Sequence, residues 1–98
     1  MPNVSRFHRD FPLDLAAATR HFDDISIRLG NRFREQIAQS LKKIQERPES
    51  CGHVTERLRA AIVPGFPYVV LYRLAGETIM FTGLFHAASD PERWSDRD

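Results

Sequence analysis

Six residues with chemically useful side chains fall in the C-terminal half of the sequence, in or beside segments that read as strands. Arginine binds phosphate through a planar fork of donors, tyrosine stacks on bases, and histidine titrates near neutral pH. Such a set could hold RNA and cleave it, by stabilising a pentavalent phosphate and moving a proton from a 2′-hydroxyl. These residues are Arg57, Arg59, Tyr68, Tyr72, Arg73 and His86.

The same residues also have structural interpretations, and the sequence leaves both open. The two tyrosines share a predicted strand face with Val70 and Leu74, which favours packing in the core. Arg73 could pair with Glu77, and His86 could be a hydrogen-bonded residue at the end of the sheet. The catalytic candidates are therefore Arg59, Arg73 and His86, and whether the protein is an enzyme stays open.

No motif with a self-contained mechanism is present. The sequence has no phosphate-binding glycine loop, no His-Glu-x-x-His and no nucleophile elbow. Cys51, the single cysteine, lies in a predicted turn with His53, and two such ligands without others seldom hold a metal. We therefore expect no metal and no cofactor. One cysteine also excludes an intramolecular disulfide and fits a reducing cytoplasm.

Length and composition predict one soluble domain spanning residues 1–98. Apolar residues make up 42% of the chain and charged residues 28%, which is typical of a globular protein. The N-terminus has no apolar signal segment, and no run approaches the roughly 18 apolar residues of a membrane span. We expect a cytoplasmic protein that is neither secreted nor inserted in a membrane.

The net charge is only +1, but the charges are unevenly distributed. Between Asn31 and Arg47, five basic residues face two glutamates, a local charge of +3. From His86 onward, four acidic residues face two arginines, a local charge of −2. Such segments could each dock a partner of opposite sign. The residues predicted to contact a partner are Arg32, Arg34, Lys42, Lys43, Arg57, Tyr72 and Trp94. Trp94 could instead fold back over the sheet.

Hydrophobic periodicity predicts an N-terminal helical hairpin. After a short strand over residues 4–8, a helix begins near Pro12, carries a one-sided apolar stripe that includes Ile25, and ends at Gly30. A second helix begins at Asn31 and is stopped by Pro48. The short link between them makes the two helices antiparallel neighbours.

Three strand-like segments follow, over residues 54–63, 68–74 and 78–85. The first alternates, and the other two are nearly continuous apolar runs joined by a break at Ala75-Gly76-Glu77 that suits a hairpin turn. The expected fold is α+β, with the helical hairpin packed on a small, mostly antiparallel sheet of three to four strands.

Several of these segments, taken in order, resemble the RelE/ParE toxin superfamily, the plasmid stabilisation proteins. The resemblance extends from the first strand through Trp94. The matching segments are Leu29-Gly30-Asn31-Arg32-Phe33, Ile44-x-x-x-Pro48, Arg59, Phe66-Pro67-Tyr68, Tyr72-Arg73 and His86 with Asp90-Pro91.

The resemblance implies a toxin of a type II toxin–antitoxin pair, neutralised by a cognate antitoxin that wraps its helices and sheet. RelE-like members cut mRNA on the ribosome with basic residues, whereas ParE-like members inhibit DNA gyrase without them. Here Pro64, Ala88 and Ser89 stand where a RelE-like nuclease would carry basic groups, and the tail is acidic. We therefore expect a ParE-like protein. The alternatives are a RelE-like nuclease and an attenuated member that binds antitoxin without toxicity.

Overall fold

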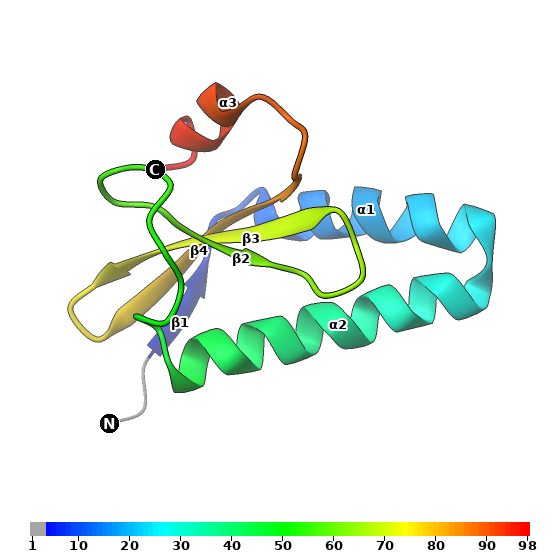
Figure 1. The fold of residues 1–98 in the computed structure, drawn as a ribbon, viewed down its shortest axis with the longest axis horizontal. Coiled ribbons are helices and arrows are strands. Elements are labelled where there is room, and N and C mark those ends of the chain that lie inside the picture. The colour runs from blue at the N-terminus through cyan, green and yellow to red at the C-terminus, as the bar shows by residue number, and fades with distance from the viewer. Residues whose placement is uncertain (1–3) are drawn as a thin grey trace.

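A computed structural model, which describes residues 4–98, places a helical hairpin on one face of a four-stranded sheet and a short C-terminal helix on the other (Figure 1). The sheet order is β1-β4-β3-β2; β1 runs parallel to β4, and the other pairs are antiparallel. The predicted α+β fold with a mostly antiparallel sheet is confirmed. The elements are β1 (Val4–Phe7), α1 (Phe11–Ile25), α2 (Ile27–Glu46), β2 (Arg59–Ile62), β3 (Tyr68–Ala75), β4 (Thr78–His86) and α3 (Pro91–Ser95).

The hairpin turns at Ser26, so the predicted boundary at Gly30 and Asn31 is wrong. Ser26 has an extended backbone and its hydroxyl accepts a hydrogen bond from the Leu29 N–H, which caps the start of α2. Gly30 is buried inside α2, where a Cβ would overlap the carboxylate of Asp23 on α1. This glycine therefore serves close contact between the helices rather than a helix end.

The predicted strand over residues 54–63 is shorter than expected. Only Arg59–Ile62 is strand, because local hydrogen bonds close the preceding residues into a loop. The Thr55 hydroxyl accepts from the Leu58 N–H, and the Val54 N–H donates to the Leu58 carbonyl. Threonine side chains of this kind compete with a strand ladder for backbone groups.

β3 and β4 form the centre of the sheet. Gly76, with a φ of +61°, supplies the left-handed residue of their tight turn. The register shifts where Leu71 faces Gly83 and Tyr72 faces Phe81, so Thr82 is an extra residue and β4 carries a bulge.

Two hydrophobic clusters lie on opposite faces of the sheet. The larger fills the space under the hairpin and includes Phe22, Phe33 and Phe81. The smaller consists of Leu58, Val69, Leu71, Phe85 and Trp94, so Trp94 folds back over the sheet. The C-terminal helix α3 thus covers the face of the sheet opposite the helical hairpin.

Candidate functional site

The three catalytic candidates do not form one cluster. His86 lies opposite Tyr68 in the β3–β4 ladder, whereas Arg73 lies opposite Met80. The two positions are five residues apart along β3, roughly 16 Å. They also lie on opposite faces of the sheet. The His86 ring contacts Tyr68, which packs on the hairpin side. Arg73 is two residues after Leu71 on β3 and therefore shares its face, the α3 side.

Both arginine candidates are engaged within the protein. Arg59 donates to the carbonyls of Glu49 (3.2 Å) and Cys51 (2.7 Å), and so holds the loop after α2 against β2. Arg73 pairs with Asp98 at 3.7 Å rather than with Glu77. They line a common depression of about 460 Å³ that mixes both signs of charge. Its lining includes Glu49, His53, Glu56, Arg57, Arg59 and Arg73.

His86 is exposed at the end of β4, and its structural interpretation is the one that the contacts support. Its Nδ1 accepts a hydrogen bond from the Ala88 N–H at 3.0 Å, and its carbonyl accepts from Ser89. A histidine bonded in this way stabilises the turn that leads to α3. Neither Arg59 nor Arg73 lies beside it to bind the phosphate that a nuclease must hold. The arginine that lines the same depression as His86 is Arg93, which was not among the catalytic candidates.

The basic residues of α2 that were predicted to contact a partner are exposed, but one of them is already paired. Arg34 binds Asp23 through two hydrogen bonds of 2.9 and 2.6 Å. This pair lowers the pKa of the Asp23 carboxyl and raises the pKa of Arg34. Arg32, Lys42 and Lys43 make no ion pair within residues 4–98. These three residues and Arg57 are the predicted partner contacts that are exposed and make no ion pair in that range.

Tyr72 and Trp94, also predicted as partner contacts, are core residues in this structure. Tyr72 is 0% exposed and its hydroxyl donates to the Pro48 carbonyl at 2.8 Å. Trp94 is 8% exposed and its indole N–H donates to the Ser89 hydroxyl. Neither side chain is accessible to a partner in this conformation, because each is buried and its polar group is hydrogen-bonded within the protein.

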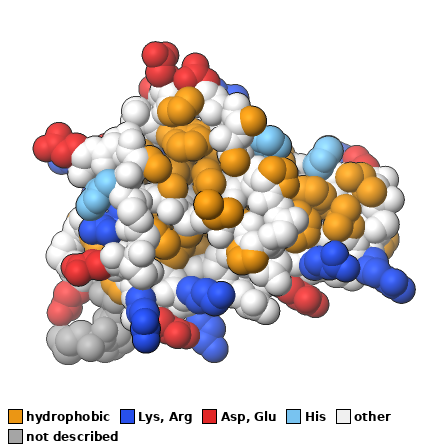
Figure 2. All heavy atoms as spheres, viewed as in Figure 1, with side chains coloured by type: hydrophobic (Ala, Val, Ile, Leu, Met, Phe, Trp, Pro, Cys, Tyr) orange, Lys and Arg blue, Asp and Glu red, His pale blue; other side chains and the backbone are white. Residues whose placement is uncertain are grey.

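A groove that the sequence analysis did not identify lies between α2 and the edge strand β2. Its volume is about 310 Å³, and its lining includes Ser40, Lys43, Ile44, Ala61 and Pro64. Hydrophobic side chains gather over this middle part of the molecule in the view of Figure 2. The sequence offered only a hint of this edge in Pro64, two residues after Ile62, because proline is confined to sheet edges. Pro64 does not show that Ile62 is exposed or that α2 lies beside it.

Part of the β2 edge is open for pairing. The Val63 N–H donates to the Tyr68 carbonyl, so by alternation the backbone groups of Ile62 point away from β3. The Ala60 N–H is already bonded to the Gly52 carbonyl. Ile62 is 76% exposed. The groove and this edge could together accept an extended apolar segment, with an acidic residue facing Lys43.

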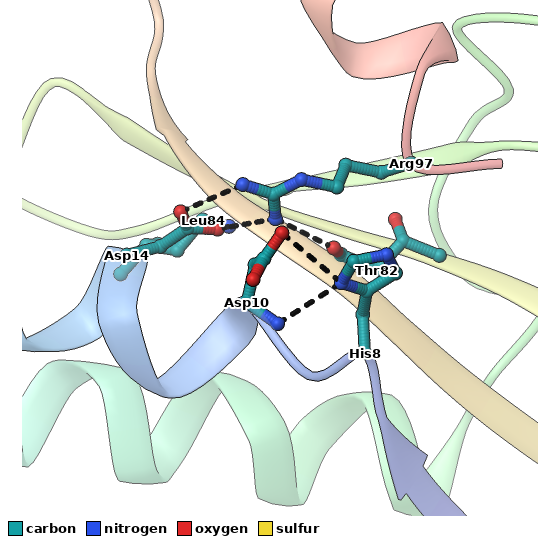
Figure 3. Close-up of polar contacts among 6 residues, drawn as sticks. All are labelled: His8, Asp10, Asp14, Thr82, Leu84 and Arg97. Carbon is teal, nitrogen blue, oxygen red and sulfur yellow. Dashed lines mark hydrogen bonds and ion pairs between the residues drawn. The ribbon is translucent and has the colours of Figure 1, made fainter.

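A second feature missed from the sequence is a clamp on the C-terminal segment (Figure 3). Arg97 binds both carboxylate oxygens of Asp14 at 2.7 and 2.9 Å and also donates to the Thr82 carbonyl. Asp14 accepts the Leu84 N–H as well. The carboxylate raises the pKa of Arg97. The clamp therefore joins α1, the β4 bulge and the residues after α3.

Within residues 4–98, no three His, Cys, Asp or Glu side chains come together in a way that could hold a metal ion. No helix in the same range is both long enough and apolar enough to cross a membrane.

Comparison with known proteins gives a similarity in structure but none in sequence. No family model matches the sequence, and no curated protein matches it. The structure is similar to a chain of the solved structure described as "Chromosomal ParDE TA system from P. aeruginosa", with a TM-score of 0.73 and 17% sequence identity. The match covers 86% of this chain and 95% of that one. It shows a shared fold, which confirms the RelE/ParE-like fold expected from the sequence.

Proposed function

We propose that this protein is the toxin of a type II toxin–antitoxin pair, that it acts in the cytoplasm, and that it is ParE-like, inhibiting DNA gyrase. The observation that carries the proposal is the fold shared with the ParDE chain, which this protein covers almost completely. The sequence segments that resemble the RelE/ParE superfamily support it independently.

The placement of the catalytic candidates disfavours RNA cleavage. A nuclease of the RelE type needs phosphate-binding and proton-transfer groups around one scissile phosphate. Here His86 is remote from both arginines and lies on the other face from Arg73. The depression that holds Arg59 and Arg73 also contains Glu49 and Glu56, whose charges repel a polyanion.

The proposed partner is an antitoxin segment that is acidic and partly apolar. Arg32, Lys42 and Lys43 attract acidic groups along α2, and the groove beside Ile62 accepts apolar ones. Charge steering makes association faster at low salt, whereas apolar burial supplies most of the final affinity. The complex should therefore form faster at low salt but persist at high salt.

Induced expression with and without the adjacent reading frame tests this proposal. We expect growth arrest with the protein alone, rescue by the neighbouring gene product, and co-elution of the two in gel filtration at low and high salt. Ile62→Asp, which places a charge in the groove, should weaken the complex about tenfold or more. Leu13→Asp is the matched control, since Leu13 is 66% exposed outside the groove.

Failure of the two proteins to co-elute would contradict the proposal. Co-elution without growth arrest, at expression levels where the protein is verified as folded, would instead identify an attenuated member that binds its antitoxin and harms nothing.

A further inference from the structure

The end of the helical hairpin carries two exposed isoleucines that the core does not explain. Ile25 is 63% exposed and Ile27 is 68% exposed, on either side of Ser26. Neither belongs to the hydrophobic clusters of the described residues. Figure 1 shows this end of the hairpin projecting past the sheet. Two exposed isoleucines thus lie two positions apart at a protruding end of the hairpin, which we call the hairpin tip (residues 25–32).

The hairpin tip is held rigid by contacts directly behind it. Ser26 caps α2 through the Leu29 N–H, and Arg34 bridges to Asp23 on α1 through two hydrogen bonds. Gly30 allows the helices to approach there, since a Cβ would displace the Asp23 carboxylate. A braced tip loses little conformational entropy on binding, and this lowers the cost of association.

Basic groups border Ile27, one of the two exposed isoleucines. A shallow depression is lined by Ile27, Arg28, Asn31, Arg32 and Glu35, a local charge of +1 from two arginines and one glutamate. Figure 2 shows the same arrangement, with hydrophobic side chains at the hairpin end bordered below by Lys and Arg side chains. Apolar side chains flanked by arginines are a common composition for the centre of a protein interface. The complementary surface is an apolar pocket with acidic groups at its rim.

The hairpin tip is separate from the groove proposed for the antitoxin. Ile27 and the groove residue Ile44 are 17 residues apart on the same helix, about 26 Å along its axis. An extended antitoxin segment in the groove would leave the hairpin tip uncovered. The protein therefore presents two distinct surfaces to two partners.

We propose that the hairpin tip is the surface that docks on the cellular target, inserting Ile25 and Ile27 into an apolar pocket rimmed by acidic groups on DNA gyrase. This inference rests on the proposed function and specifies which part of the protein carries it out. Arg28 and Arg32 then face the acidic rim, and the Asp23–Arg34 pair keeps the hairpin tip in its binding geometry.

Binding of purified variants to reconstituted bacterial DNA gyrase tests the inference. I25S/I27S should weaken binding about tenfold or more, which corresponds to about 1.4 kcal/mol or more. R28Q/R32Q should weaken it mainly at low salt, because it removes a steering charge and leaves both isoleucines in place. Leu13→Ser, at a comparably exposed position at the other end of α1, should bind as the native protein does. I25S/I27S and Leu13→Ser should retain native affinity for the antitoxin. R28Q/R32Q removes Arg32, one of the basic residues that attract the antitoxin, and should associate with it more slowly at low salt.

Three results would overturn the inference. Native binding and supercoiling inhibition by folded I25S/I27S would refute the hairpin tip and leave the proposed function standing. Absence of any gyrase binding by the native protein would refute both. A concentration-dependent dimer of the native protein in sedimentation, dissolved in I25S/I27S, would show that the hairpin tip pairs with a second copy of this chain instead.

Discussion

Tyr72 had two interpretations in the sequence, a residue that contacts a ligand or partner and a residue of the core. Its position on a strand face with Val70 and Leu74 favoured the core, and the structure places it there at 0% exposure. The hydrogen bond from its hydroxyl to the Pro48 carbonyl could not be predicted, because it joins β3 to the end of a helix 24 residues earlier in the chain.

Replacing Tyr72 with phenylalanine should change the stability of the protein in alkali. Burial raises the pKa of Tyr72, so the folded state keeps its proton while the unfolded state loses it near pH 10. The native protein should therefore lose stability as the pH rises above about 10. Tyr72→Phe should flatten this loss, at a cost near neutral pH of about 1 kcal/mol from the missing hydrogen bond.

Urea unfolding of both proteins between neutral pH and pH 11 measures the difference. Burial also raises the pKa of Tyr68, so the variant should retain part of the alkaline slope. Identical slopes for the two proteins would contradict the assignment of Tyr72 as a buried neutral donor.

Among the elements, the helical hairpin shows why a boundary could be misplaced although both helices were predicted. Gly30 followed by Asn31 is a strong signal for a helix end and a new cap, and periodicity alone cannot tell this from a glycine needed for close helix contact. The turn at Ser26 moves Ile25 out of the buried stripe and leaves it 63% exposed. The exposure of Ile25 could therefore not be predicted, because it depends on a helix boundary that only the packed structure shows.

The C-terminal segment depends on the clamp between Arg97 and Asp14, and its substitution gives a prediction at the scale of the element. Both side chains are less than a fifth exposed. Removing one partner of a fully buried ion pair costs about 3–5 kcal/mol, so Arg97→Gln should cost somewhat less here, on the order of 2–3 kcal/mol. Arg97→Lys keeps the charge but loses the bidentate contact, so its stability should lie between those of the native protein and Arg97→Gln.

Denaturant midpoints, together with the fluorescence of Trp94, report this effect. Trp94 is the only tryptophan, so its emission should shift toward the solvent-exposed value if α3 detaches before the sheet unfolds. A native midpoint for Arg97→Gln would show that the clamp contributes nothing to stability.

At the scale of the whole molecule, the fold was predictable to a greater extent than the binding surfaces. Except for the short helix α3, element types and their order came from hydrophobic periodicity and turn residues, and the sequence resemblance identified the architecture. The groove beside Ile62 was not predictable, because it depends on β2 being an edge strand, and strand order is a property of the packed sheet. The clamp joins residues 83 positions apart, which local patterns do not report.

The catalytic candidates stayed ambiguous in the sequence because their relative placement also depends on the packed sheet. Arg73 and His86 lie on consecutive strands, yet the register and alternation of the sheet place them on opposite faces and roughly 16 Å apart along it. Residue types alone could not exclude a shared active site, whereas their placement disfavours one.

A parallel assay of gyrase supercoiling and of mRNA cleavage in a translating extract tests the central claim most directly. The proteins to compare are the native chain, His86→Ala, and the triple variant R59A/R73A/H86A, whose folding must be verified because Arg59 holds the loop after α2. We predict that the native protein inhibits supercoiling, that both folded variants still do so, and that none of them cleaves mRNA. Codon-specific cleavage by the native protein that is lost in the folded variants would contradict the account.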